Sequence, residues 1–212
     1  MTFRRQRGVK KDLAVQAVNN KNKTIYIKAN NKMELPNSTV VNVVSEQSSI
    51  LLPKTLTEDI ISSLNDALVE EYTAHYFYRG AANWCAGVAY NKAAAFFTAE
   101  AAAELEHAEK LQKYLVDWNC TPKLPSVRFS GEFKGLIDVV NKSYAIEYQL
   151  GNKYMNWASQ VFPKHLMTFN FLQEFVDVQN QSIAEYSDLL NAAQLVDVND
   201  KLNLLHYEER YF

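Results

Sequence analysis

Four long stretches of the sequence repeat apolar residues at the three- and four-residue spacing of a helix that buries one face. They cover approximately residues 56–84, 91–118, 133–162 and 166–193. The first stretch starts within Thr55-Leu56-Thr57-Glu58, which has the form of a capping box, and Pro163 ends the third. We therefore predict an all-α fold in which residues 56–193 form a four-helix bundle.

The segment between the second and third predicted helices indicates how the chain crosses this bundle. Residues 119–131 hold two prolines and a glycine, and they are long enough to run along the length of a bundle. The turn after Pro163 is short, so we expect the third and fourth helices to be neighbours. Residues 194–212 are expected to be a tail or a short fifth helix, because an apolar cluster covers residues 202–207.

Each predicted long helix has a polar side chain at a position where its apolar face should continue. In chain order these side chains are Glu71, Glu104 with His107, Glu147 and Gln179. A carboxylate that faces an apolar core is unfavourable by several kcal/mol unless it is paired or binds a metal ion. Three such carboxylates in one core therefore predict a cation site.

Glu104 and His107 have the Glu-x-x-His spacing, which places a carboxylate and an imidazole one turn apart on one helix face. Alone this spacing is weak, but here carboxylates on two other helices accompany it, so we interpret His107 as a metal ligand. His75 has no second partner in the sequence, and we expect it to be structural or to contact a ligand. Tyr78 either packs in the core or donates a hydrogen bond to a ligand. Glu100 is expected at the rim of the site.

Residues 64–193 resemble non-haem ferritin. The stretches that carry the resemblance are LNDALVEEYTAHYFYRGAANWC, AAAFFTAEAAAELEHAEKLQKYL, SYAIEYQLG and TFNFLQEFVDVQNQS. The resemblance implies a ferritin-like bundle with an iron-oxidising centre, in which one iron is bound by Glu71, Glu104 and His107. It implies that a second iron is bound by the shared Glu104 and by Glu147, with Gln179 nearby and Tyr78 as the family's tyrosine beside the centre.

The implied activity is that of a ferroxidase, which oxidises two Fe(II) ions per subunit with O₂ or peroxide for iron storage or detoxification. Ser182 stands where some bacterial members have a carboxylate, so the second iron is expected to bind weakly. The fourth helix lacks a second Glu-x-x-His, which argues against bacterioferritin, and the absence of Cys-x-x-Cys argues against rubrerythrin. The resemblance also implies a homo-oligomer, such as a cage.

The first 55 residues differ in composition from the remaining chain. They hold ten Lys or Arg and three Asp or Glu, whereas the rest holds 12 basic and 21 acidic residues. Two β-like runs lie within them, at residues 24–27 and 39–44. Such a basic arm predicts docking or assembly through an acidic protein surface, a shell or nucleic acid, although a solubilising tail is as consistent with the charge. It leaves open a structural function, as a ferritin-fold subunit of a virion or protein shell.

The sequence also bears on where the protein acts. No apolar run reaches membrane-spanning length, and the N-terminus has no signal-peptide pattern. The two cysteines, Cys85 and Cys120, are too few for a disulfide framework. We expect a protein without a membrane partner that is cytoplasmic or incorporated in a larger particle.

Overall fold

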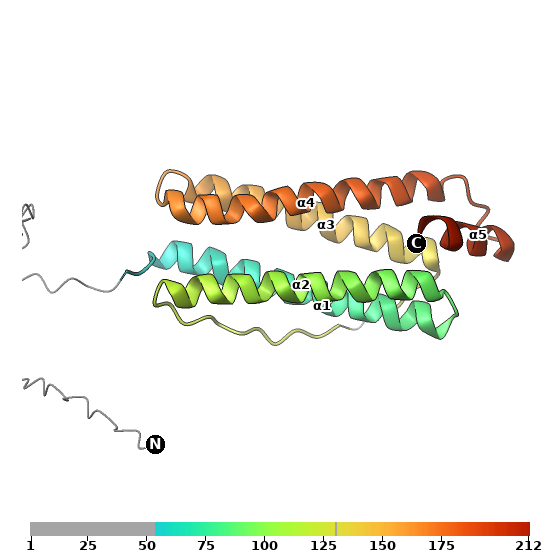
Figure 1. Ribbon diagram of the computed structural model, residues 1–212, viewed down its shortest axis with the longest axis horizontal. Coiled ribbons are helices and arrows are strands. Elements are labelled where there is room, and N and C mark those ends of the chain that lie inside the picture. The colour runs from blue at the N-terminus through green and yellow to red at the C-terminus, as the bar shows by residue number, and fades with distance from the viewer. Residues whose placement is uncertain (1–53, 130) are drawn as a thin grey trace, which may run out of the picture. The chain divides into compact units, whose positions relative to one another are not determined.

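In the computed structural model, which describes residues 54–129 and 131–212, the chain forms five α-helices (Figure 1). They are α1 (Glu58–Gly87), α2 (Asn91–Asp117), α3 (Leu136–Val161), α4 (Leu166–Ala193) and α5 (Lys201–Tyr211). The predicted four-helix bundle with a short fifth helix is thus confirmed for this part of the chain. The β-like runs predicted for the arm lie outside the described residues.

Two helix starts differ from the prediction. Glu58 is the first residue of α1, and its N-cap Thr57 makes no side-chain capping bond, so the predicted capping box is wrong. The Thr57 hydroxyl instead donates to the Asp59 carboxylate at 2.5 Å. Helix α3 begins at Leu136, three residues after the predicted start, because the Asp138 carboxylate accepts the backbone N–H of Lys134 (2.9 Å) and so ends the loop there.

The bundle consists of two antiparallel helix pairs, α1 with α2 and α3 with α4 (Figure 1). A long connection from α2 to α3 runs along the length of the bundle, and its Lys123 N–H donates to Asn65 Oδ1 on α1 at 2.7 Å. This crossover makes α3 antiparallel to α1. The ion pair between Lys164, just after α3, and Asp59, at the start of α1, spans 2.5 Å and confirms this direction.

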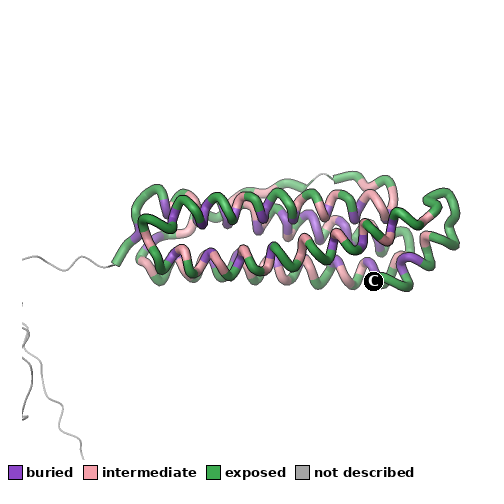
Figure 2. Tube along the Cα trace, turned by 90° about the horizontal axis from the view of Figure 1, so that it is seen from above, coloured by how far each residue is buried: buried purple, intermediate pink, exposed green. Residues whose placement is uncertain are grey.

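The buried side chains form two apolar clusters, one in each half of the bundle, and the purple segments of Figure 2 face inward along all four long helices. On α1, Leu68 belongs to the first cluster and Ala74 to the second. On α3, Leu150 belongs to the first and Val140 to the second. The residues between these positions form the boundary between the clusters, and the predicted polar side chains occur there.

Helix α5 packs against the end of the bundle where α2 begins. Glu208 is buried, and one of its carboxylate oxygens accepts the backbone N–H groups of Lys92 (2.6 Å) and Ala93 (3.1 Å). A carboxylate at this place satisfies free N–H groups and the positive end of the α2 dipole. Among the described residues, none of the helices is both long and apolar enough to span a membrane.

Candidate metal centre

The boundary between the two apolar clusters is a polar layer at mid-bundle. Its members are Glu71 on α1, Glu104 on α2, Glu147 on α3 and Gln179 on α4, with exposed fractions of 0%, 4%, 0% and 2%. Each comes from a different long helix. The sequence analysis predicted that these four side chains point into the bundle, and all four are buried. Their role as ligands remains a prediction.

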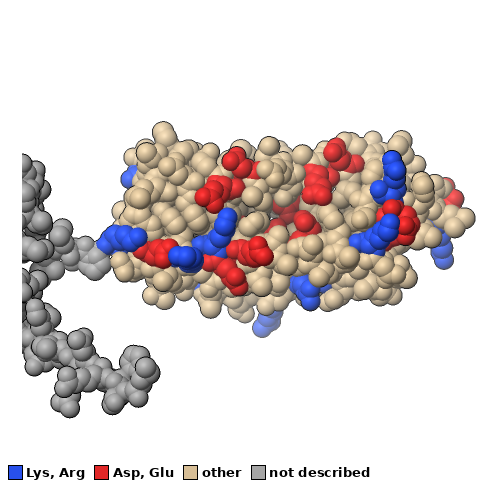
Figure 3. Space-filling model, viewed as in Figure 1, with Lys and Arg blue, Asp and Glu red and all other residues tan. Residues whose placement is uncertain are grey.

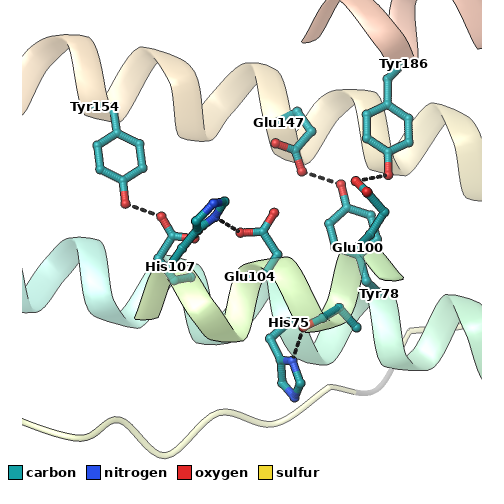
Figure 4. A network of polar contacts seen from close by, with 10 residues as sticks. His75, Tyr78, Glu100, Glu104, His107, Glu147, Tyr154 and Tyr186 are labelled. Carbon is teal, nitrogen blue, oxygen red and sulfur yellow. Dashed lines mark hydrogen bonds and ion pairs between the residues drawn. The ribbon is translucent and has the colours of Figure 1, made fainter. Parts of the chain in front are cut away.

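Candidate ligand atoms of Glu71, Glu104 and His107 lie within 4.8 Å of one another and form the first group. His107 Nδ1 is 3.1 Å from Glu104 Oε2 and 3.6 Å from Glu71 Oε2 (Figure 4). The Glu-x-x-His spacing brings Glu104 and His107 together on α2. The packing of α1 against α2 places Glu71 beside them. An imidazole with two carboxylates is a donor set suited to a first-row transition metal.

Glu147 and Gln179 lie on the α3–α4 side of the layer. Glu147 does not belong to the 4.8 Å group, and its Oε1 accepts the Tyr78 hydroxyl. Burial and the charge of Glu104 raise the pKa of Glu147, and the nearby Gln179 side chain opposes part of this rise. The structure thus places both residues in the layer, opposite the first group.

Three acceptor atoms in this layer have no hydrogen-bond partner. They are Glu71 Oε2, Glu147 Oε2 and Gln179 Oε1. A buried acceptor without a donor is unfavourable by about 1–3 kcal/mol, more for a charged group. Cations bound between these oxygens would satisfy all three, so the residues present fit the binding of iron ions.

The pKa values of the site follow from its burial and its crowding of like charges. Burial raises the pKa of Glu104 to about 8, and burial with the charge of Glu104 raises that of Glu147 to about 8. Burial would lower the pKa of His107, but its contacts with Glu104 and Glu71 prevail and raise it to about 10. Each of these raised pKa values favours the protonated form of its group. The metal-free site therefore retains protons, which a bound cation would displace.

Tyr78 packs in the core, where it stacks on Phe97 with ring centroids 6.1 Å apart, and its hydroxyl donates to Glu147, whose role as a ligand remains a prediction. His75 lies outside the group of ligand atoms, and its Nδ1 contacts the backbone carbonyl of Ala101 at 2.6 Å, a structural contact between α1 and α2. Glu100 accepts the Tyr186 hydroxyl at 3.1 Å and is half-buried, as expected at the rim.

The sequence interpretation missed Tyr154 as part of the site. Its hydroxyl donates to Glu71 Oε1, and the side chain is fully buried (Figure 4). The signal that would have indicated it is its spacing, since Tyr154 follows Glu147 by seven residues just as Tyr78 follows Glu71.

Comparisons with known proteins place the chain among ferritins. A family model described as a ferritin-like domain matches residues 61–196. A bacterial non-haem ferritin from Campylobacter jejuni is 31% identical over 144 residues, covering 66% of this chain and 86% of the relative. A probable bacterial non-haem ferritin-like protein from Haemophilus influenzae is 28% identical over 152 residues, covering 71% and 87%. The fold is similar to that of an open-pore ferritin from the hyperthermophilic archaeon Archaeoglobus fulgidus, with a TM-score of 0.69 and 21% identity, covering 74% of this chain and 96% of that one.

Proposed function

Because the chain belongs to the ferritin family, we propose that it binds two Fe(II) ions in its mid-bundle layer and oxidises them to Fe(III) for storage or detoxification. The observation that carries this proposal is the trio of buried acceptors without partners, next to one imidazole and three carboxylates. In an apolar core this arrangement is stable only with protons or cations bound. Iron is the substrate of the site.

The residues divide into two sets that share Glu104. The first Fe(II) would be held by Glu71, Glu104 and His107, and the second by Glu104 and Glu147 with Gln179 nearby. Hard oxygen donors favour Fe(III) over Fe(II), so binding itself assists oxidation. The second set has no imidazole, which makes it the weaker of the two and favours release of the product.

The overall reaction requires a two-electron oxidant. Each Fe(II) loses one electron, and O₂ accepts both electrons with two protons to become H₂O₂. Peroxide can serve instead, when two electrons and two protons convert it to two water molecules. The carboxyl protons that the metal-free site retains leave as the ions bind, because only the ionised oxygens are ligands.

Iron would approach the site from the face formed by α2 and α4. Figure 3 shows both acidic and basic side chains on this face, with acidic ones near its middle. The ion pair between Lys110 and Glu174 (3.3 Å) links α2 to α4 across it. His107 has the most exposed side chain of the first set, at 18%, so this set is the one that solvent reaches.

The proposal is tested by titrating the full chain anaerobically with Fe(II), counting the bound ions per chain, and then adding O₂. We expect two ions per chain and rapid formation of Fe(III). A chain that binds no Fe(II), or that binds it and oxidises it no faster than buffer does, would contradict the proposed function.

We predict that His107→Ala weakens the first iron site far more than His75→Ala does. His107 supplies a ligand nitrogen, so its loss should exceed the roughly 10–100-fold effect of losing an outer partner of a ligand. His75 hydrogen-bonds to a backbone carbonyl and lies outside the group of Glu71, Glu104 and His107, so its replacement should leave affinity within about threefold, well below that range. Anaerobic Fe(II) titration of both variants measures the difference, and equal losses would show that the histidine roles are assigned wrongly.

We also propose that the subunits form a homo-oligomer, as ferritins do, and that residues 1–55 dock to an acidic protein surface, a shell or nucleic acid. The cytoplasmic location, or incorporation in a larger particle, stays a prediction. The charge of residues 1–55 supports the docking proposal. Binding to nucleic acid would weaken steeply with salt, whereas pairing of β-like segments with a protein would largely survive it.

Deleting residues 1–50 should leave the bundle folded and its iron binding unchanged. The proposed ligands all lie on α1 to α4, and α1 begins at Glu58. Circular dichroism and Fe(II) titration test the bundle, while sedimentation velocity compares the assembly of both chains. If the truncated chain fails to fold, the boundary at residue 55 is wrong.

A further inference from the structure

Helices α1 and α3 carry the same pair of residues at the same spacing. Glu71 and Tyr78 are seven residues apart on α1, and Glu147 and Tyr154 are seven residues apart on α3. Seven residues make about two helical turns, so each pair lies on one face. Because the two helices are antiparallel, each tyrosine lies opposite the carboxylate of the other helix. The Tyr78 hydroxyl donates to Glu147 Oε1, and the Tyr154 hydroxyl donates to Glu71 Oε1.

This reciprocal pairing gives the two carboxylates the same arrangement of hydrogen bonds. The four side chains of the two pairs are each 0% exposed, so water does not compete for these hydrogen bonds. In each carboxylate Oε1 is held by a phenol, while Oε2 has no hydrogen-bond partner. For Glu71 the free Oε2 is also the oxygen nearest His107 Nδ1, at 3.6 Å.

The Tyr154 ring is itself fixed by aromatic packing. It stacks on Phe175 of α4 with ring centroids 5.0 Å apart and 16° between the planes, and Trp157 packs on it edge to face at 5.3 Å. Phe175 also packs against the His107 ring, at 5.8 Å. One aromatic side chain therefore supports both His107 and the phenol that holds Glu71.

We propose that Tyr154 is a positioning residue of the first iron site, which holds Glu71 by one oxygen so that the other alone is offered to the metal ion. The inference rests on the proposed function, since it requires a metal ion between Glu71, Glu104 and His107. Tyr78 does the same for Glu147 at the second site. The two sites are thus supported by a matched pair of tyrosines from opposite helices.

Removing the hydroxyl group should weaken metal binding at the first site only. Without it Glu71 can rotate in the free protein, and the lost freedom on binding lowers affinity. Loss of an outer partner of a ligand typically lowers metal affinity about 10–100-fold. Tyr154→Phe keeps the ring and its stacking on Phe175, so it removes only the hydrogen bond.

The experiment titrates the full chain anaerobically with Co²⁺, which reports binding by its d–d absorption and is not oxidised. His107→Ala identifies which binding step belongs to the first site. We expect Tyr154→Phe to weaken that step about 10-fold or more and to leave the other within about threefold. Tyr78→Phe should show the reverse pattern. Tyr207→Phe is the matched control, because its buried hydroxyl donates to the backbone carbonyl of Leu189, away from the polar layer, and it should change neither step.

Unchanged affinity at the first site in Tyr154→Phe, or an equal loss at both sites, would overturn the proposal. A lower melting temperature of the metal-free variant with unchanged Co²⁺ affinity would also overturn it, because the hydroxyl would then serve only the fold. Failure of the proposed function is recognised separately, when the unaltered chain binds Co²⁺ but does not accelerate the oxidation of Fe(II).

Discussion

Replacing Glu104 with alanine should abolish rapid oxidation of Fe(II) while leaving the bundle folded. In the proposed site Glu104 belongs to both iron sites, so its loss disables each of them. The effect should exceed the roughly 10–100-fold loss that follows removal of an outer partner of a ligand. The fold should survive, because burial already raises the pKa of Glu104 to about 8, which shows that its charge is unfavourable in the metal-free core.

Glu106 provides the matched control for this variant. It lies two residues further along α2 and is exposed, so Glu106→Ala removes a carboxylate from the same helix without touching the polar layer. Stopped-flow absorbance of Fe(III) formation measures the rate, and circular dichroism with thermal unfolding confirms the fold of both variants. If Glu104→Ala oxidises iron as fast as Glu106→Ala, the ferroxidase assignment is wrong.

The positions of these side chains could be predicted from sequence because helical periodicity is a local property. A carboxylate at the place of an apolar residue, as at Glu71 or Glu147, is conspicuous once the buried face is known. The Glu-x-x-His spacing then relates Glu104 and His107 through one turn of a single helix. None of these steps requires knowledge of how the four helices pack.

Tyr154 was missed because its role depends on that packing. A tyrosine on the apolar face of a helix is read as core filling, and its ring does fill the core here by stacking on Phe175. Its partner, Glu71, is 83 residues away on another helix. The seven-residue repeat becomes informative only when α1 and α3 are known to be antiparallel neighbours with their polar residues at one level.

Helix starts were predicted less well than helix faces for a related reason. The capping-box pattern at Thr55 and Glu58 is a common short sequence, and α1 starts at Glu58 instead. The start of α3 is set by the Asp138 carboxylate, which accepts from the Lys134 backbone. Such local competition among hydrogen bonds shifts boundaries by a few residues without changing which face is buried.

The metal-free bundle should lose stability as the pH rises from about 5 to 8. Glu104 and Glu147 have their pKa values raised to about 8, mainly by burial, so both keep a proton in the folded state that the unfolded chain releases near pH 4.5. The pKa of His107 is raised to about 10, so above pH 6.5 this side chain also keeps a proton in the folded state that the unfolded chain releases. Where the folded state binds more protons than the unfolded state, stability falls with pH. Asp59 and Asp138 have lowered pKa values and titrate below this range.

The expected decrease is large because two deeply buried carboxyl groups contribute to it, and Glu100, whose pKa burial raises to about 7, adds to it. A pKa difference of one between the folded and unfolded states corresponds to about 1.4 kcal/mol, so the sum over this range is of the order of several kcal/mol. For a chain of this size that is roughly 10 °C in melting temperature. Thermal unfolding of chelator-treated protein at pH 5 and pH 8 measures it. The double variant Glu104→Gln and Glu147→Gln keeps the shape but cannot titrate at these two positions, so it should show a smaller decrease, to which Glu100 still contributes.

Bound metal ions should reverse this dependence on pH. The ions bind only the ionised carboxylates, so their affinity increases as the pH rises, and a ligand that binds only the folded state stabilises it by mass action. With Co²⁺ in excess we therefore expect the melting temperature to be at least as high at pH 8 as at pH 5, whereas the double glutamine variant gains little from Co²⁺. A metal-free chain whose melting temperature increases from pH 5 to pH 8 would show that the layer does not retain protons. The buried carboxylates would then be stabilised by groups of the protein itself, which would remove the main physical reason for placing iron ions between them.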